Sequence, residues 1–249
     1  MPKSAPTRSR SGYETPKPPS QILCGAARNR QAKEVSLRTR SAPLLATALA
    51  LGLAGCVPAT TPDPTPTSAG GNAMEKLAEL TVASAGSMKG YSRDRFPHWR
   101  GTGKNCDVRD TVLARDGESI KLSGCNVVGG RWESVYDGLV LTDPSEVDVD
   151  HMVPLANAWR SGADGWTDTK RGDFANDTRL PHLFAVSRTA NRSKGDQDPS
   201  QWRPANRSYW CRYAESWVTV KHHWQLSVHT DEKTALADML AGCTGASRP

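Results

Sequence analysis

The stretch Asp148–Asp196 decides the fold. It opens with DVDHMVPLANAW (148–159) and closes with SRTANRSKGD (187–196), and between these ends lie FAND (174–177) and the apolar run LFAV (183–186). The two ends carry Asp, His and Asn side chains, which are the types that bind a hard divalent ion and accept a proton near neutral pH. We therefore expect the two ends to meet around a metal ion.

A strand–strand–helix order is predicted for this stretch. Apolar residues alternate with acidic ones from position 147, which indicates a strand ending at Asp150-His151, and Pro154 then stops that strand and begins a short helix. A long loop leads to the run 183–186, which is expected to be a second strand, and Ser187 is the expected N-cap of the helix that follows. Neighbours on a regular strand face opposite ways, so we expect the Asp-His pair at a frayed strand end. The fold class is α+β.

The residue types suit phosphodiester hydrolysis, which needs an activated water and a cation that neutralises phosphate charge. A neutral His151 is the candidate that takes the proton from water. Asp150 suits Mg²⁺, and Asn191 offers a carbonyl oxygen as a second ligand. Simpler interpretations exist: an Asp-His surface turn, an Asx-turn at Asn176 and a solvated helix face over 191–194. The order and spacing of the three together favour the nuclease interpretation.

These residues carry a resemblance to a known family. The pattern DVDH-x-VPL, FAND, hydrophobic strand and NRSKGD resembles the HNH branch of the His-Me finger (ββα-metal) nucleases, in particular secreted nucleases related to the C-terminal domain of GmrSD restriction enzymes. The resemblance covers roughly Leu77 to Cys243. It includes CDVRDTVL (106–113), GGRWESVYDG (129–138) and DPSQW (198–202).

The resemblance implies a role for each motif residue. His151 is similar to the general base, Asp150 and Asn191 to the metal ligands, and Asn176 to the middle asparagine that braces the loop holding the base. The third motif residue of the family is often His, and here it is Asn191. The implied fold is a ββα-metal core with flanking hairpins and helices, and the implied cofactor is Mg²⁺ or Mn²⁺.

Two classes of function follow. The first is an exported, metal-dependent HNH endonuclease that cleaves DNA, with RNA left open as a substrate. The second is a surface lipoprotein whose nuclease-like fold only binds a polymer or a partner. The intact set of Asp150, His151 and Asn191 favours the first class.

The N-terminal part of the chain predicts export. Residues 1–56 form a charged leader with the apolar run PLLATALALGLA (43–54), which is too short for a membrane span. It ends in LAGC (53–56), which resembles a bacterial lipobox, so Cys56 is a candidate for lipidation. An ordinary secretory signal, with Cys56 incidental, is the alternative. A Pro/Thr-rich tether is expected over 57–72, and the folded domain over 73–249, held at a membrane only by the lipid anchor.

The positive charge of the chain lies in the leader. The sequence has 32 Lys and Arg against 26 Asp and Glu, a formal charge of +6. Residues 1–55 hold 9 of these basic and 2 of these acidic residues, which leaves 23 and 24 in the remainder. A nucleic-acid surface must therefore be local, and the basic residues near the motif are its candidates, each with a solvated helix face as the alternative. They are Arg188, Arg192, Lys194, Arg203, Arg207, Arg212 and Lys221, of which the first three are the predicted phosphate-binding residues.

Four cysteines follow the lipobox: Cys106, Cys125, Cys211 and Cys243. They permit three disulfide pairings, of which the local one, Cys106–Cys125 with Cys211–Cys243, closes loops of modest length. Disulfides persist in an oxidising compartment, which agrees with export.

The flanking sequence predicts a scaffold. A strand is expected over 119–128, a hairpin about Asp137-Gly138, and helices over 108–114, 210–224 and 230–240, the last capped by Thr230. The tryptophans of 210–224 lie on one helical face, and we expect them in the core rather than as platforms for stacked bases.

Overall fold

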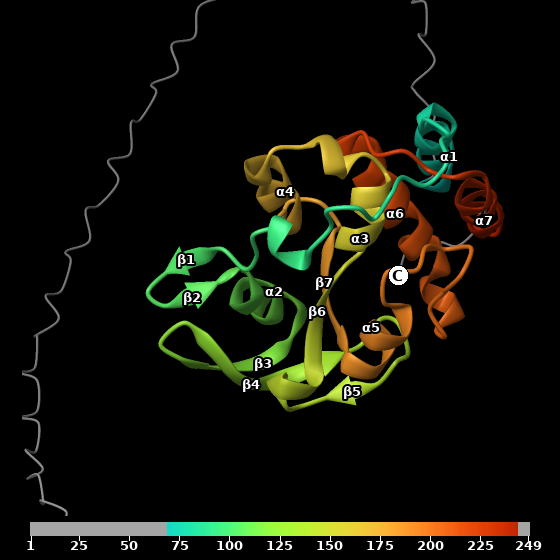
Figure 1. Cartoon of the computed structure of the whole chain (residues 1–249). Coiled ribbons are helices and arrows are strands. Elements are labelled where there is room, and N and C mark those ends of the chain that lie inside the picture. The colour runs from blue at the N-terminus through green and yellow to red at the C-terminus, as the bar shows by residue number, and fades with distance from the viewer. Residues whose placement is uncertain (1–68, 244–249) are drawn as a thin grey trace, which may run out of the picture. The chain divides into compact units, whose positions relative to one another are not determined.

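The strands predicted around the central motif pair with each other. The computed structural model of the chain describes residues 69–243, and in this part strand β6 (Val147–His151) runs antiparallel to β7 (Leu183–Ser187). The register pairs Asp150 with Phe184 and His151 with Leu183, so the ladder is regular to the last residue of β6. The two strands lie side by side in Figure 1. The expected fraying at Asp150-His151 is therefore wrong, because both residues belong to the ladder and send their side chains to opposite faces.

Helix α5 (Arg188–Lys194) follows β7 directly and completes the predicted strand–strand–helix order. The Ser187 hydroxyl accepts a hydrogen bond from the Ala190 amide at 3.1 Å, which confirms the predicted N-cap. The helix packs against both β6 and β7, and it ends at Gly195, whose φ of 54° is readily adopted by glycine. One face of α5 is thereby fixed against β6.

The connection between β6 and β7 contains helices where the sequence predicts a long loop. It holds α3 (Leu155–Arg160), a 3₁₀ turn (Ala163–Gly165) and α4 (Asp168–Ala175). The α3 helix agrees with the short helix expected after the proline. The α4 helix has apolar residues only in its last two positions, so its sequence shows no helical period. Its N-cap, Thr167, is the local signal for it.

The remaining strands form two small antiparallel sheets. They are β1 (Gly101–Gly103) with β2 (Cys106–Asp107), and β3 (Glu118–Ser123), β4 (Asn126–Glu133) and β5 (Val140–Leu141) in that order. The single strand expected over 119–128 is wrong, because the chain reverses at Gly124 with a φ of 67° and supplies two strands. The hairpin expected about Asp137-Gly138 is present as the pairing of β4 with β5.

Three helices from the two ends of the described chain pack together. They are α1 (Ala69–Glu79), α6 (Trp210–Trp224) and α7 (Thr230–Ala241) (Figure 1). Helix α1 begins earlier than the predicted domain start near Ala73. The expected N-cap of α7 is one residue off, because His229 accepts the Glu232 amide with its ring nitrogen. The other helical segments are α2 (Val108–Asp116) and the 3₁₀ turns Arg93–Arg95, Pro144–Glu146 and Arg207–Tyr209.

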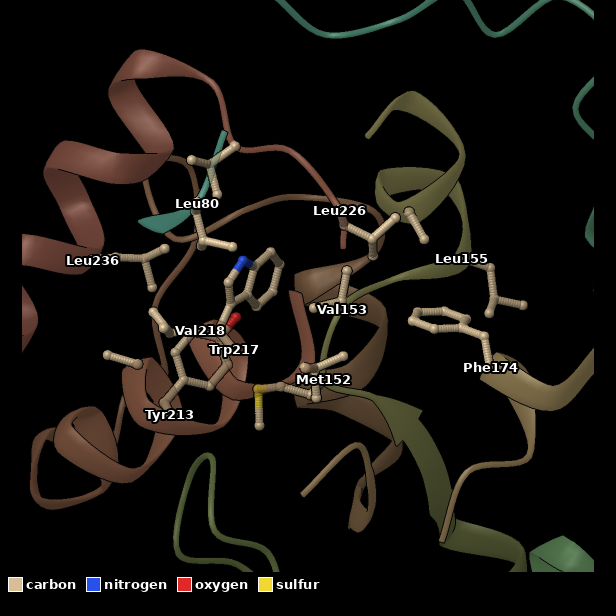
Figure 2. Close-up of a cluster of buried hydrophobic side chains, with 14 of the residues drawn as sticks. Leu80, Met152, Val153, Leu155, Phe174, Tyr213, Trp217, Val218, Leu226 and Leu236 are labelled. Carbon is tan, nitrogen blue, oxygen red and sulfur yellow. The ribbon is translucent and has the colours of Figure 1, made fainter. Parts of the chain in front are cut away.

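The main core joins this helical layer to the end of β6. Trp217 and Tyr213 of α6 are fully buried in it, and Met152 and Val153, which follow β6, insert into the same cluster (Figure 2). Trp210 and Trp224 pack against it while partly buried. The prediction that these tryptophans belong to the core is therefore confirmed for Trp217, whereas Trp210 and Trp224 lie at the edge of the core. The chain just after His151 is anchored by apolar packing.

Both disulfides of the local pairing are formed. Cys106 joins Cys125 and Cys211 joins Cys243, with Cα atoms 5.7 and 5.5 Å apart. The first ties the β1–β2 hairpin to the β3–β4 turn, and the second ties the start of α6 to the end of α7. Bridges of this size add about 2–4 kcal/mol to stability, chiefly by restricting the unfolded chain.

The predicted leader, the lipobox with Cys56 and most of the predicted tether lie outside the described residues. Within residues 69–243, no helix combines the length and the apolar character that a membrane crossing needs.

Candidate active site

His151 ends β6 with its ring enclosed on several sides. Its Nε2 lies 2.9 Å from the carbonyl oxygen of Ala175, at the end of α4, and the indole of Trp99 stacks on the ring with centroids 5.2 Å apart and planes 9° apart. Because Nε2 donates to a carbonyl, Nδ1 carries the lone pair. Nδ1 makes no hydrogen bond to any described residue, and it is not sealed from solvent. The ring is thus held in the tautomer that accepts a proton at Nδ1.

Burial keeps this imidazole neutral. Burial, joined by the positive charge of neighbouring histidine and arginine groups such as Arg93, holds the pKa of His151 well below its ordinary value, against the Ala175 hydrogen bond that raises it. The ring of His182 lies behind, 5.3 Å away, and its own pKa is lowered by burial to about 3. His151 is therefore a free base at neutral pH.

Asp150 leaves β6 on the other face and is buried at 5 % exposure. Its Oδ2 accepts hydrogen bonds from the Tyr136 hydroxyl at 2.7 Å and from Lys194 Nζ at 2.6 Å. Its Oδ1 has no hydrogen-bond partner among the described residues and is not sealed from solvent. One carboxylate oxygen is thus anchored and the other is left for a ligand.

Asn191 meets the same strand from α5. Its Nδ2 donates to Asp148 Oδ2 at 3.0 Å, so its amide oxygen is free to serve as a ligand. Asp148 and Asp150 lie two apart on β6 and share a face, and they meet Asn191 and Lys194, which lie three apart on α5. A spacing of two on a strand and a spacing of three on a helix each place two side chains on one face. Two side chains of β6 can therefore meet two side chains of α5.

One pocket of about 310 Å³ collects these groups. The predicted ligands, the predicted base and one predicted phosphate-binding residue line it together: Asp150, His151, Asn191 and Arg192. Tyr91, Arg93 and Asp196 complete its polar lining. Arg188 and Asn176 do not line this pocket.

Asn176 braces the base indirectly. Its Oδ1 accepts the Arg100 amide at 2.8 Å, and its Nδ2 donates to the carbonyl oxygens of Pro97 and Gly172, each at 2.7 Å. It therefore ties the end of α4, whose Ala175 holds the base, to the segment that carries Trp99. These contacts are compatible with the bracing role that the resemblance implies for the middle asparagine, which stays a prediction.

Residues 91–100, which we term the strap, form one wall of the site and are fastened to α4. Arg95 pairs with Asp168 at 3.2 Å and Arg100 with Asp173 at 2.6 Å. These exposed pairs are individually weak, so the buried parts of the strap and the Asn176 bonds carry most of its placement. The strap brings an indole and an arginine to a site defined more than fifty residues later in the chain.

Burial corrects one predicted phosphate contact, Lys194, and one further residue of the basic patch, Lys221. Lys194 is fully buried and its ammonium donates to Asp150 and to the His151 carbonyl, so it reaches no substrate. Burial lowers its pKa while the Asp150 carboxylate raises it. Lys221, also assigned to the basic patch, is buried against Glu232 at 2.6 Å. Their charges stabilise carboxylates inside the protein.

The structure brings to this site several residues that the sequence did not predict. Asp148 had a usable signal, because its spacing from Asp150 places it on the same strand face. Trp99, His98 and Arg93 had none, since the strap shows neither period nor motif. Tyr136 was part of a predicted hairpin, with no sign that its hydroxyl would reach Asp150.

The oxygen atoms that the site offers fit a hard divalent ion. Asp150 Oδ1 and Asn191 Oδ1 are hard oxygen ligands without hydrogen-bond partners among the described residues, and both residues line one pocket. Among residues 69–243, no cluster of three or more His, Cys, Asp or Glu side chains has a metal-binding arrangement. Mg²⁺ commonly takes one or two protein oxygens and completes its shell with water and phosphate, so two ligands suffice.

Comparison with known proteins identifies the family of the chain. Residues 108–239 match the family described as "GmrSD restriction endonucleases, C-terminal domain". The chain is also similar to an "Uncharacterized secreted protein" of Arthroderma benhamiae, with 46 % identity over 187 residues, 75 % of this chain and 92 % of that protein. No solved structure matches the chain.

Proposed function

Because the chain belongs to the family of GmrSD restriction endonuclease C-terminal domains, we propose that it is an exported, metal-dependent endonuclease that hydrolyses phosphodiester bonds of DNA. The family implies an HNH-like fold, and the β6–β7–α5 unit corresponds to the ββα finger. One observation carries the proposal: one pocket is lined both by a neutral histidine with Nδ1 free and by the two residues with unpartnered oxygen ligands.

Each residue has a defined part in the proposed reaction. His151 accepts at Nδ1 the proton of the attacking water, while the Ala175 carbonyl and the Trp99 indole keep the ring in place. Asp150 and Asn191 hold the divalent ion, Mg²⁺ or Mn²⁺, and Arg192 contacts a phosphate of the substrate. When bound, the ion neutralises charge on the phosphate and on the leaving oxygen.

Lys194 adjusts the charge of the ligand set. Since its ammonium is paired with Asp150 at 2.6 Å, the carboxylate brings little net charge to the pocket. A phosphate of the substrate would then supply much of the charge needed to hold an ion at Asp150 and Asn191, as is common for Mg²⁺ sites. Metal binding and substrate binding are therefore expected to reinforce each other.

Plasmid cleavage tests the proposal directly. The mature chain incubated with supercoiled plasmid is expected to nick and linearise it with Mg²⁺ or Mn²⁺, and to leave it intact with EDTA, read by agarose electrophoresis. A structured RNA in parallel decides whether RNA is also a substrate. Binding without cleavage in any metal would instead support the alternative of a surface lipoprotein that binds a polymer or partner.

Export is supported by the two disulfides and by the secreted relative. We further propose the organisation leader (1–56), tether and nuclease domain, with Cys56 lipidated and with the domain beginning at α1, at Ala69 and not at 73. Cys56→Ser is expected to move the protein from the membrane fraction to the medium, or to leave it unprocessed. Fractionation identical to the wild type would show that no lipid anchor is formed at Cys56.

A further inference from the structure

We propose that Arg93, on the strap, binds the scissile phosphate in the pocket of His151. The proposal rests on the function proposed above, and it assigns to that site a cation that neither the sequence motif nor the family match includes. It also distinguishes the two arginines of the pocket, because Arg93 acts on the reacting phosphate and Arg192 on a neighbouring one.

The position of Arg93 is set by a short chain of contacts. Its Nε donates to His98 Nε2 at 3.1 Å. The imidazole of His98, whose Nδ1 faces the Phe96 carbonyl, stands edge-on to the ring of His151 with centroids 5.8 Å apart. The guanidinium is thereby fixed at one nitrogen beside the base, and Arg93 lines the pocket with Asp150, His151 and Asn191.

The two terminal nitrogens of Arg93 are available for a ligand. Neither makes a hydrogen bond or an ion pair with any described residue. The neighbouring arginines differ, because carboxylates engage three of them: Arg95 by Asp168, Arg100 by Asp173 and Arg160 by Asp196. A guanidinium held at Nε, with both terminal nitrogens free, presents the fork that binds two oxygens of a phosphate.

The chemistry requires such a group. A phosphodiester carries one negative charge, and a further one develops on its oxygens as water adds to phosphorus. A cation that gains contact as this charge develops accelerates the reaction, whereas one that binds a distant phosphate mainly adds affinity. Arg93 stands beside the base, and Arg192 lies on α5 next to the ligand Asn191.

The first arm of the test measures binding in EDTA, where cleavage is absent. A duplex oligonucleotide is titrated at several salt concentrations with the wild type and with Arg93→Gln, Arg192→Gln and Arg95→Gln. Each lost phosphate contact lowers the slope of log K against log salt by about 0.9. We expect this change for Arg93→Gln and Arg192→Gln, and an unchanged slope for the matched control Arg95→Gln, whose guanidinium is held by Asp168.

The second arm measures single-turnover cleavage with saturating Mg²⁺ and DNA. Arg93→Gln is expected to lower the rate constant by about 10²–10³-fold, and Arg192→Gln to leave it within about threefold once DNA is saturating. Arg93→Lys should keep the salt slope and lose much of the rate, because a lysine supplies charge without the fork. Arg93 is exposed, so circular dichroism of its variants is expected to match the wild type.

The outcomes distinguish the two levels of proposal. If the wild type neither binds nor cleaves DNA or RNA, the proposed function fails and this inference with it. If the wild type cleaves, but Arg93→Gln keeps both the salt slope and the rate constant, the inference alone is overturned. A changed slope with an unchanged rate constant would place Arg93 on a flanking phosphate and would also overturn it.

Discussion

His151→Ala is expected to slow plasmid cleavage by about 10²–10⁴-fold, the usual effect of losing a general base. Binding of Mg²⁺ or Mn²⁺, followed by calorimetry, should stay nearly unchanged. The reason lies in how the groups are held: Asp150 is fixed by Tyr136 and Lys194, and Asn191 by Asp148, without any contact to the imidazole. His151→Ala should therefore lower the cleavage rate without lowering the affinity for the metal ion.

Two comparisons sharpen this result. Exogenous imidazole is expected to restore part of the activity of His151→Ala, because it replaces the missing proton acceptor, and none of that of Asp150→Ala. Asn176→Ala should fall between the wild type and His151→Ala, since it loosens the strap and the end of α4 but leaves the ring in place. Cleavage by His151→Ala at the wild-type rate would show that the base lies elsewhere.

The pH dependence offers a third comparison. His151 acts in its unprotonated form, and burial lowers its pKa, so activity is lost only when the pH falls through that depressed value. The acidic limb of the wild-type rate profile is therefore expected below pH ~6.5, the ordinary value for histidine.

Asp150→Ala is expected to lower the free energy of unfolding by about 3–5 kcal/mol, in addition to weakening metal binding. The carboxylate is the charged partner of Lys194, whose ammonium is fully buried, and breaking a buried ion pair on one side leaves an uncompensated charge. Urea denaturation of the metal-free protein measures the loss. Without that measurement, lost activity in this variant would be ascribed wholly to the metal.

The matched variants are Asp150→Asn, Lys194→Met and the two combined. Lys194→Met alone leaves Asp150 buried without its cation and is expected to destabilise to a similar degree. The double variant carries neither charge of the buried pair, so it should recover most of the stability of the wild type. Its affinity for the metal ion should remain below that of the wild type, because the charged ligand is lost. If Asp150→Ala unfolds at the wild-type urea concentration, Lys194 is not charged against Asp150.

The sequence predicted the finger well because its signals are local. The alternation before Asp150 and the cap at Ser187 each act within a few residues, and both are present in the structure. The motif also named four residues that the structure brings to one pocket, Asp150, His151, Asn191 and Arg192. Residue type, spacing and the family resemblance predicted the first three, and the local excess of basic residues predicted Arg192.

The support of the site was not predictable in the same way. Lys194 looked like one of several surface cations of a basic helix, and its burial depends on Asp150 and Tyr136, which reach it from other elements. Trp99 and His98 come from a segment without periodicity, and only the tertiary fold carries them to His151. Charge and periodicity within one segment do not contain that information.

The strap has a consequence for when the site becomes complete. The hydrogen bonds and the ion pair that fasten it to α4 and Asn176 join residues 73–79 positions apart. Contacts of such separation close large loops and form after local ones, whereas β7 and α5 are contiguous. As a chain emerges N-terminus first, residues 91–100 appear early and must wait for residues 168–176. Asn191 emerges later still, so the base can be held before the second ligand oxygen is present, and the site becomes complete only when α5 has formed.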